Sequence, residues 1–147
     1  MTESAALGPV VVRNVEGMHL AQSITVGGHE IRADEPKALG GGDTGPGPHD
    51  LLLAALGACT AMTLRLYAER KGWDIGNLTV GLAIRWERIE GRAEKRVAIE
   101  RRIESDRALT QEQQTRLAEI ADKCPVHRTL MGDKVITTRL SAPAAGA

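Results

Sequence analysis

The sequence predicts one domain of mixed helix and strand, in the order β-β-β-α-β-β-α-β. Segments that alternate apolar and polar residues are separated by turn residues, which is typical of strands. Two segments with helical spacing, residues 48–71 and 111–124, interrupt these strands. The 147 residues contain no repeat and no linker, and this length suits a single domain over residues 1–147.

Three strands are expected before the first helix, over residues 10–12, 20–26 and 30–33. Gly27-Gly28 lies between the second and third strands and predicts a two-residue hairpin turn. Residues 40–48 are rich in Gly and Pro and favour neither helix nor strand. Residues 1–8 and 141–147 are expected to be flexible tails.

The first helix is expected to begin at Pro48, with Asp50 at the positive end of its dipole, and to stop at Gly72. It is apolar nearly all the way round as far as Leu64, so we expect it to be buried on most sides. The apolar run from Leu51 to Leu64 spans about 14 residues, which is too short to cross a bilayer.

Two more strands are expected over residues 78–87 and 96–104, because apolar and polar residues alternate there. Thr110-Gln111-Glu112-Gln113 has the form of a capping box and opens a second helix, which Pro125 should end. A last strand is expected over residues 135–140.

The composition disfavours several classes of partner. Lys+Arg and Asp+Glu number 19 each, so the chain offers no net charge to nucleic acid or to an anionic membrane. Aromatic residues make up 2%, which leaves few platforms for stacking bases. The N-terminus lacks the pattern of a secretory signal. We therefore expect a cytoplasmic protein with no nucleic-acid or membrane partner, in which thiols are normally reduced.

Cys59 and Cys124 are the two cysteines of the chain, and each lies in a segment with helical spacing. Spacing places Leu52, Leu56 and Cys59 on one helix face, continued by Met62 and Leu66. Cys124 shares a face of the second helix with Leu117, so both sulfurs are expected to point inward. A single cysteine in an apolar helix is most often a small buried hydrophobe. Two inward cysteines, one of them close to His127, also suit a redox pair, and both interpretations stay open.

The two thiols are not expected to play the same part, because only a thiolate attacks. Cys124 is predicted at a helix C-terminus, where the dipole disfavours a thiolate, so it suits the resolving role. Cys59 is about three turns into its helix, and its activation requires a cation or hydrogen-bond donor from elsewhere in the fold. Candidates for this partner are Arg13, Arg32, His49 and His127.

A zinc site is the competing interpretation, with Cys59, Cys124 and His127 as three possible ligands. Neither cysteine belongs to a CxxC pair, and the surroundings of Cys59 are apolar, so the pattern gives little support to a metal. Gly40 to Gly47 lacks the Gly-Lys-Ser/Thr ending of a phosphate loop.

Two segments resemble the OsmC/Ohr family, the osmotically inducible protein C and organic hydroperoxide resistance proteins. Residues 45–63, with Gly57-Ala58-Cys59-Thr60, resemble the first-cysteine helix of that family. Residues 120–130, with Cys124-Pro125-Val126-His127, resemble its second-cysteine segment. The resemblance runs from about residue 10 to 140, and the separation of the two cysteines fits the family.

This resemblance implies an α+β fold with two central helices, each carrying one cysteine. It implies an intertwined homodimer in which antiparallel strands of both subunits wrap these helices. The implied activity is the reduction of hydroperoxides, especially organic ones, with Cys59 peroxidatic and Cys124 resolving. An external dithiol restores both thiols, and no metal, haem or flavin is implied.

One position departs from the family pattern. Well-characterised members carry a Glu after an Asn-Pro pair, where with an Arg it orients the attacking cysteine. Here Pro48 is followed by His49 and Asp50, and only Arg32 and Arg13 are candidates for the Arg. Either His49 or Asp50 takes over the polar role of the Glu and supports Cys59, or peroxide is not the physiological substrate. This suits the OsmC-like branch of the family.

We therefore predict a thiol-dependent peroxidase of the antioxidant stress response that uses Cys59 and Cys124. The alternative is a redox-sensing or small-molecule-binding dimer of the same fold with little peroxidase turnover.

Overall fold

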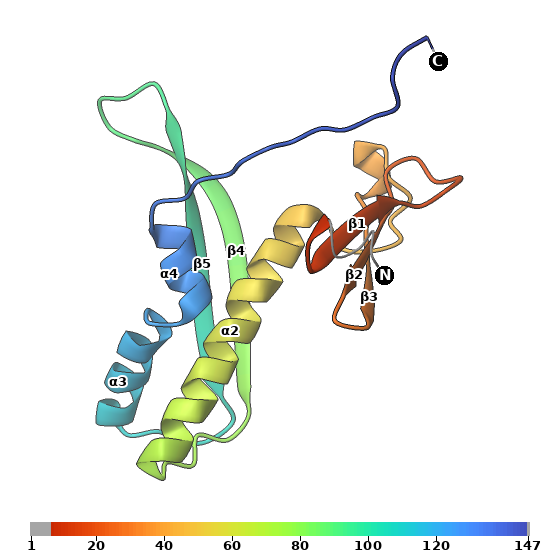
Figure 1. The fold of residues 1–147 in the computed structure, drawn as a ribbon. Helices are drawn as coiled ribbons and strands as arrows, with labels where there is room; N and C mark the ends of the chain where they lie inside the picture. Colours follow the sequence, from red (N-terminus) through yellow and green to blue (C-terminus); the bar gives the residue numbers. More distant parts are fainter. Residues whose placement is uncertain (1–6, 147) are drawn as a thin grey trace. The chain divides into compact units, whose positions relative to one another are not determined.

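The computed structural model of the chain describes residues 7–146 (Figure 1). Within them, two compact units form, one from residues 7–58 and 79–104 and the other from residues 59–78 and 105–146. Residues 1–6 of the predicted N-terminal tail, and residue 147 of the C-terminal one, lie outside the described residues. The assignment of the whole chain to one domain stays a prediction.

The first unit contains an antiparallel sheet in the order β1-β2-β3, with β1 at Val10–Asn14, β2 at Gln22–Val26 and β3 at His29–Ala33. The predicted hairpin is confirmed, with Gly27 and Gly28 as its loop. Their φ angles are 53° and 80°, in the left-handed region that both loop residues of such a turn require.

Asp34 organises the glycine-rich loop that follows β3 and contains the short 3₁₀ helix η1 (Lys37–Leu39). Its side chain is buried and accepts hydrogen bonds from the backbone N–H groups of Glu35 (2.8 Å), Gly42 (3.2 Å) and Thr44 (3.2 Å). The Thr44 hydroxyl donates a further bond of 2.6 Å. These bonds, the hydroxyl bond first, lower the pKa of Asp34 to about 2. The loop therefore depends on an ionised Asp34.

Helix α2 (Pro48–Lys71) begins and ends where the sequence predicts. The Asp50 carboxylate accepts a hydrogen bond of 3.0 Å from the N–H of Gly47, immediately before the helix. Gly72 has a φ of 67° and follows the last helical residue. The Trp73 N–H then bonds to the carbonyl of Ala68 at 2.9 Å, which closes the last turn.

The prediction that α2 is buried on most sides is wrong for the single chain. Leu52, Met62 and Leu66 are 39%, 65% and 58% exposed. By length and composition α2 could cross a membrane, because its most apolar 18-residue window has a mean hydropathy of 1.6. The core helices of soluble proteins have the same length and composition, so this property alone does not indicate a membrane protein. Only 39% of that window is buried within the chain, so a long apolar face is left uncovered.

Both strands expected between the helices are confirmed. They are β4 (Leu78–Arg88) and β5 (Lys95–Ser105), which form a two-stranded sheet. Gly57 permits the close approach of α2 to this hairpin, because a Cβ at that position would lie 2.7 Å from Cδ1 of Leu82. A larger residue at position 57 would require the leucine to move.

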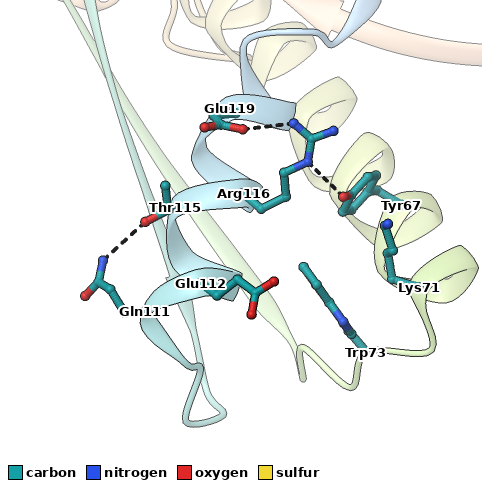
Figure 2. Close-up of a pocket in the computed structure, with 8 residues that line it drawn as sticks. All are labelled: Tyr67, Lys71, Trp73, Gln111, Glu112, Thr115, Arg116 and Glu119. Carbon is teal, nitrogen blue, oxygen red and sulfur yellow. Dashed lines mark hydrogen bonds and ion pairs between the residues drawn. The ribbon is translucent and has the colours of Figure 1, made fainter.

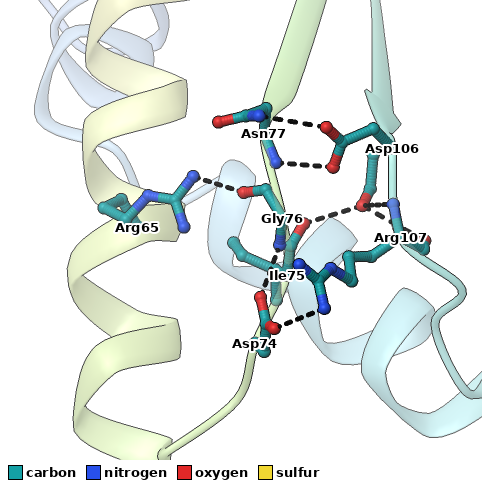
Figure 3. Close-up of polar contacts among 8 residues, drawn as sticks. Arg65, Asp74, Ile75, Gly76, Asn77, Asp106 and Arg107 are labelled. Carbon is teal, nitrogen blue, oxygen red and sulfur yellow. Dashed lines mark hydrogen bonds and ion pairs between the residues drawn. The ribbon is translucent and has the colours of Figure 1, made fainter.

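In the second unit, a polar network joins the segment after α2 to the segment after β5 (Figure 3). Asn77 donates its backbone N–H and its side-chain amide to the Asp106 carboxylate, at 2.8 and 3.0 Å. Asp74 and Arg107 form an ion pair at 2.8 Å. Gly76 has a φ of 62°, and a Cβ there would lie 2.1 Å from Oδ1 of Asp106. This junction therefore requires glycine at position 76.

The capping box is confirmed at the start of α3 (Gln111–Ala121), where Thr110 and Gln113 bond reciprocally. However, α3 stops at Ala121, before Cys124, and a further helix α4 (Pro125–Met131) follows. Pro125 was expected to end a helix and instead begins one. Both outcomes suit proline, which lacks an N–H and has a φ suited to the first helical position.

The expected last strand over residues 135–140 is absent. Residues 133–144 have no regular structure, and the side chains of Val135, Ile136 and Leu140 are 92%, 90% and 91% exposed. The β-branched residues Val135 and Ile136 favour a strand, but a strand also needs a neighbour that pairs with its backbone. In this single chain the segment remains extended (Figure 1).

Candidate functional site

Cys124 is fully buried in the second unit, at the residue that precedes α4. Its Sγ accepts a hydrogen bond of 3.3 Å from the backbone N–H of His127, so that the sulfur caps the helix. The predicted position at a helix C-terminus is therefore wrong. The N-terminal end of a helix favours a thiolate, which removes the dipole argument for assigning Cys124 the resolving role.

Cys59 lies on α2, also in the second unit, and is partly exposed. The inward face predicted for this helix is displaced by about one residue from the observed one. Leu53, Thr60 and Tyr67 are buried where Leu52, Cys59 and Leu66 were expected to be. The buried side chains of α2 are those of Leu53, Leu56, Thr60, Leu64, Tyr67 and Ala68. Because α2 is apolar around most of its circumference, residue spacing alone could not select the face that the core covers.

Thr60 is the residue of α2 that contacts the second cysteine. Its hydroxyl lies 4.0 Å from Sγ of Cys124, and both side chains are fully buried. Sequence reasoning missed Thr60, because its spacing of four residues from Leu56 and from Leu64 is only one of several apolar spacings along this helix. The contact places Cys124 against the residue that directly follows Cys59.

Of the predicted supporting residues, His127 is brought to a cysteine. Its backbone binds Cys124, and its ring Nδ1 lies 3.9 Å from Oδ1 of Asp122. The other four candidates belong to the first unit, whereas both cysteines belong to the second. They are Arg13, exposed on β1; Arg32, which donates to the Met18 sulfur at 3.4 Å; His49, exposed on α2; and Asp50, bonded to Gly47.

The metal alternative receives no geometric support from the part of the chain that the structure describes. Within residues 7–146, no three His, Cys, Asp or Glu side chains cluster closely enough to hold a metal ion. Cys59 and Cys124 are not joined by a disulfide in this structure. Thiols of this kind are capable of redox chemistry.

A cavity of about 430 Å³ lies between the C-terminal half of α2 and α3 (Figure 2). The rings of Tyr67 and Trp73 meet edge to face at 5.8 Å. Arg116 donates to the Tyr67 hydroxyl at 2.9 Å and to Glu119 at 2.8 Å. The lining mixes cations and carboxylates and includes neither cysteine. This cavity therefore matches no single ligand class.

Comparison with known proteins identifies the family of this chain. The family model described as OsmC-like protein matches residues 40–139, a stretch that includes both cysteines and the Thr60–Cys124 contact. The chain belongs to the OsmC-like protein family. No match is found among curated protein sequences.

Solved structures of OsmC-like proteins share the fold. A Psychrobacter arcticus protein, proposed to act in osmotic stress and detoxification, is 22% identical with a TM-score of 0.68, over 82% of this chain and 86% of that one. The Legionella pneumophila organic hydroperoxide resistance protein OsmC is 17% identical, with a TM-score of 0.62 over 84% and 89%. Bacillus subtilis OhrB, an organic hydroperoxide resistance protein, is 20% identical, with a TM-score of 0.60 over 84% and 90%.

These likenesses establish an α+β fold of the OsmC type. The predicted fold class of the single chain and the predicted family are therefore confirmed, with the corrections at α4 and at residues 135–140 described above; the intertwined homodimer stays a prediction.

Proposed function

We propose that this OsmC-like protein is a thiol-dependent peroxidase that reduces organic hydroperoxides with Cys59 and Cys124 as its redox pair. The observation that carries the proposal is the burial of Cys124 against Thr60, the residue next to Cys59. Family membership supports it, since OhrB and the Legionella protein are both described as organic hydroperoxide resistance proteins.

The proposed cycle has three steps. The Cys59 thiolate attacks the peroxide O–O bond, keeps one oxygen as a sulfenic acid, and releases an alkoxide that takes a proton to become an alcohol. Cys124 then attacks the Cys59 sulfur, the S–O bond breaks, and the departing hydroxide takes a proton to become water. An external dithiol reduces the resulting disulfide and supplies both electrons, so the cycle needs no cofactor.

Burial supports the assignment of roles that the helix dipole no longer supports. Cys59 is partly exposed, so a peroxide can reach its sulfur. Cys124 is 0% exposed, and an external oxidant cannot reach it without local opening of the fold. We therefore retain Cys59 as the peroxidatic thiol and Cys124 as the resolving thiol.

The exposed face of α2 supports a homodimer. Leu52, Ala55, Cys59, Met62 and Leu66 follow one another at intervals of three and four residues, the spacing of a helix–helix contact. We call these residues the α2 stripe. A second copy of the chain would cover this apolar stripe, and Cys59 at its centre would then lie at the subunit contact, so that a peroxide would reach its sulfur along the seam between the two subunits.

Coverage by a second copy also accounts for the apolar character of α2 without a membrane. In the homodimer α2 becomes a core helix, and the protein is a soluble one of the cytoplasm. That compartment keeps thiols reduced, so the disulfide of the cycle is transient and catalytic.

Repeated turnover tests this proposal. Reduced protein with excess dithiothreitol should consume many equivalents of cumene hydroperoxide, and fewer of hydrogen peroxide in the same time. Cys59→Ser should show no turnover, because a serine hydroxyl is a far weaker nucleophile than a thiolate. A single stoichiometric oxidation that then stops would contradict the enzyme and favour a redox-sensing dimer.

A further inference from the structure

The Thr60 hydroxyl is a polar group placed at one of the most enclosed positions of the second unit. Thr60 and Cys124 are both 0% exposed, together with Leu64 and Ile75. A valine would fill almost the same volume without the cost of burying a hydroxyl. The contact of 4.0 Å between its Oγ1 and the Cys124 sulfur gives this hydroxyl a specific partner in the site.

The hydroxyl suits both protonation states of that partner, because either atom of the pair can donate. A Cys124 thiol can donate its proton to Oγ1. A Cys124 thiolate can accept the proton of the hydroxyl, as it accepts the N–H of His127 at 3.3 Å. The sulfur thus contacts the Thr60 hydroxyl on α2 and the backbone N–H of His127 on α4, whether or not it carries a proton.

We infer that Thr60 is a positioning residue for disulfide formation: it holds the Cys124 sulfur beside the turn of α2 that carries Cys59. The inference rests on the proposed function. The step it assists is the attack of Cys124 on oxidised Cys59, in which the S–S bond forms, the S–O bond breaks and water is released. The preceding attack on the peroxide does not involve Cys124, so that step does not depend on Thr60.

Three variants separate this role from a merely structural one. Thr60→Val removes the hydroxyl and keeps the shape of the side chain, whereas Thr60→Ser restores the hydroxyl. Thr63→Val is the matched control, because Thr63 lies one turn further along the same helix and is only partly buried. All three carry both cysteines, and circular dichroism checks that each is folded.

Rapid quenching and mass spectrometry after one equivalent of cumene hydroperoxide follow the two steps separately. Thr60→Val should form the sulfenic acid at the wild-type rate but the disulfide about tenfold more slowly, the cost of one hydrogen bond to a charged group. Thr60→Ser and Thr63→Val should form the disulfide at nearly the wild-type rate. Disulfide formation at the wild-type rate in Thr60→Val, or equal slowing in Thr63→Val, would overturn the inference.

Diamide, which oxidises dithiols without peroxide, keeps this test distinct from that of the proposed function. If no variant reacts with peroxide, the proposed function fails, and Thr60→Val should still slow the diamide-driven Cys59–Cys124 link. The infrared S–H band of Cys59→Ser protein, where Cys124 is the remaining thiol, should also shift when Thr60→Val is added. An unchanged band would show that the hydroxyl does not bind the thiol, which overturns the inference whatever the activity.

Discussion

Leu64 and Leu66 lie two residues apart on α2 and differ in exposure, at 0% and 58%, so the same substitution at each tests the proposed homodimer. Leu64→Ala opens a cavity inside one subunit and should cost about 2–5 kcal/mol of unfolding free energy. Leu66→Ala in an isolated chain should change stability by no more than about 0.5 kcal/mol, as at other surface positions.

A homodimer that covers the α2 stripe changes the expectation for Leu66. Full burial of a leucine contributes about 1.5–3 kcal/mol, so covering its exposed 58% contributes about 1–2 kcal/mol per subunit. Two copies lose this contribution in Leu66→Ala, roughly 2–3.5 kcal/mol per dimer. The dimer dissociation constant should rise about 30- to 300-fold.

Light scattering and urea denaturation at several protein concentrations measure both effects. Wild type should have twice the chain mass at micromolar concentration and a denaturation midpoint that rises with concentration. Leu66→Ala should dissociate within the accessible range, whereas Leu64→Ala should be less stable without a comparable change in dissociation. A wild-type monomer, or a Leu66→Ala dimer as tight as wild type, would refute the reasoning.

Three further predictions concern the loop, the polar junction and the thiols. Because the pKa of Asp34 is lowered to about 2, its contribution to stability is present above the unfolded value of about 3.9 and is lost as the pH falls through about 2. Asp34→Asn should flatten this part of the acid denaturation curve, and an unchanged curve would show that the loop does not depend on the carboxylate. Gly76→Ala should lower the thermal midpoint, because its Cβ would collide with Asp106; an unchanged midpoint would show that this junction does not require glycine. Dimedone should label Cys124→Ser strongly after peroxide and wild type weakly, and strong labelling of Cys59→Ser would reverse the roles.

Local signals in the sequence predicted much of the fold. The Gly27-Gly28 turn, the helix from Pro48 and the capping box at Thr110 each depend on residues close together in the chain, and each is confirmed. The strand expected over residues 135–140 depends on a distant pairing partner, which the residues of the segment itself do not reveal. The fold class and family could therefore be predicted from the sequence, but the conformation of the C-terminal segment could not.

The candidate site was only partly predictable for the same reason. The two cysteines were identified from their setting, but the helix end at Cys124 was not, because Pro125 is equally compatible with ending and with beginning a helix. Thr60 was missed because a uniformly apolar helix does not reveal which face the core covers. Its role emerges only from the contact with Cys124.

The most direct test of the proposed redox pair is disulfide mapping after a single oxidation. Reduced wild-type protein is treated with one equivalent of cumene hydroperoxide, blocked with an alkylating agent, digested and examined by mass spectrometry. The proposal predicts one link within one chain, between Cys59 and Cys124, that dithiothreitol reverses. Thiols that remain reduced, or a link that joins two chains through Cys59 alone, would contradict it.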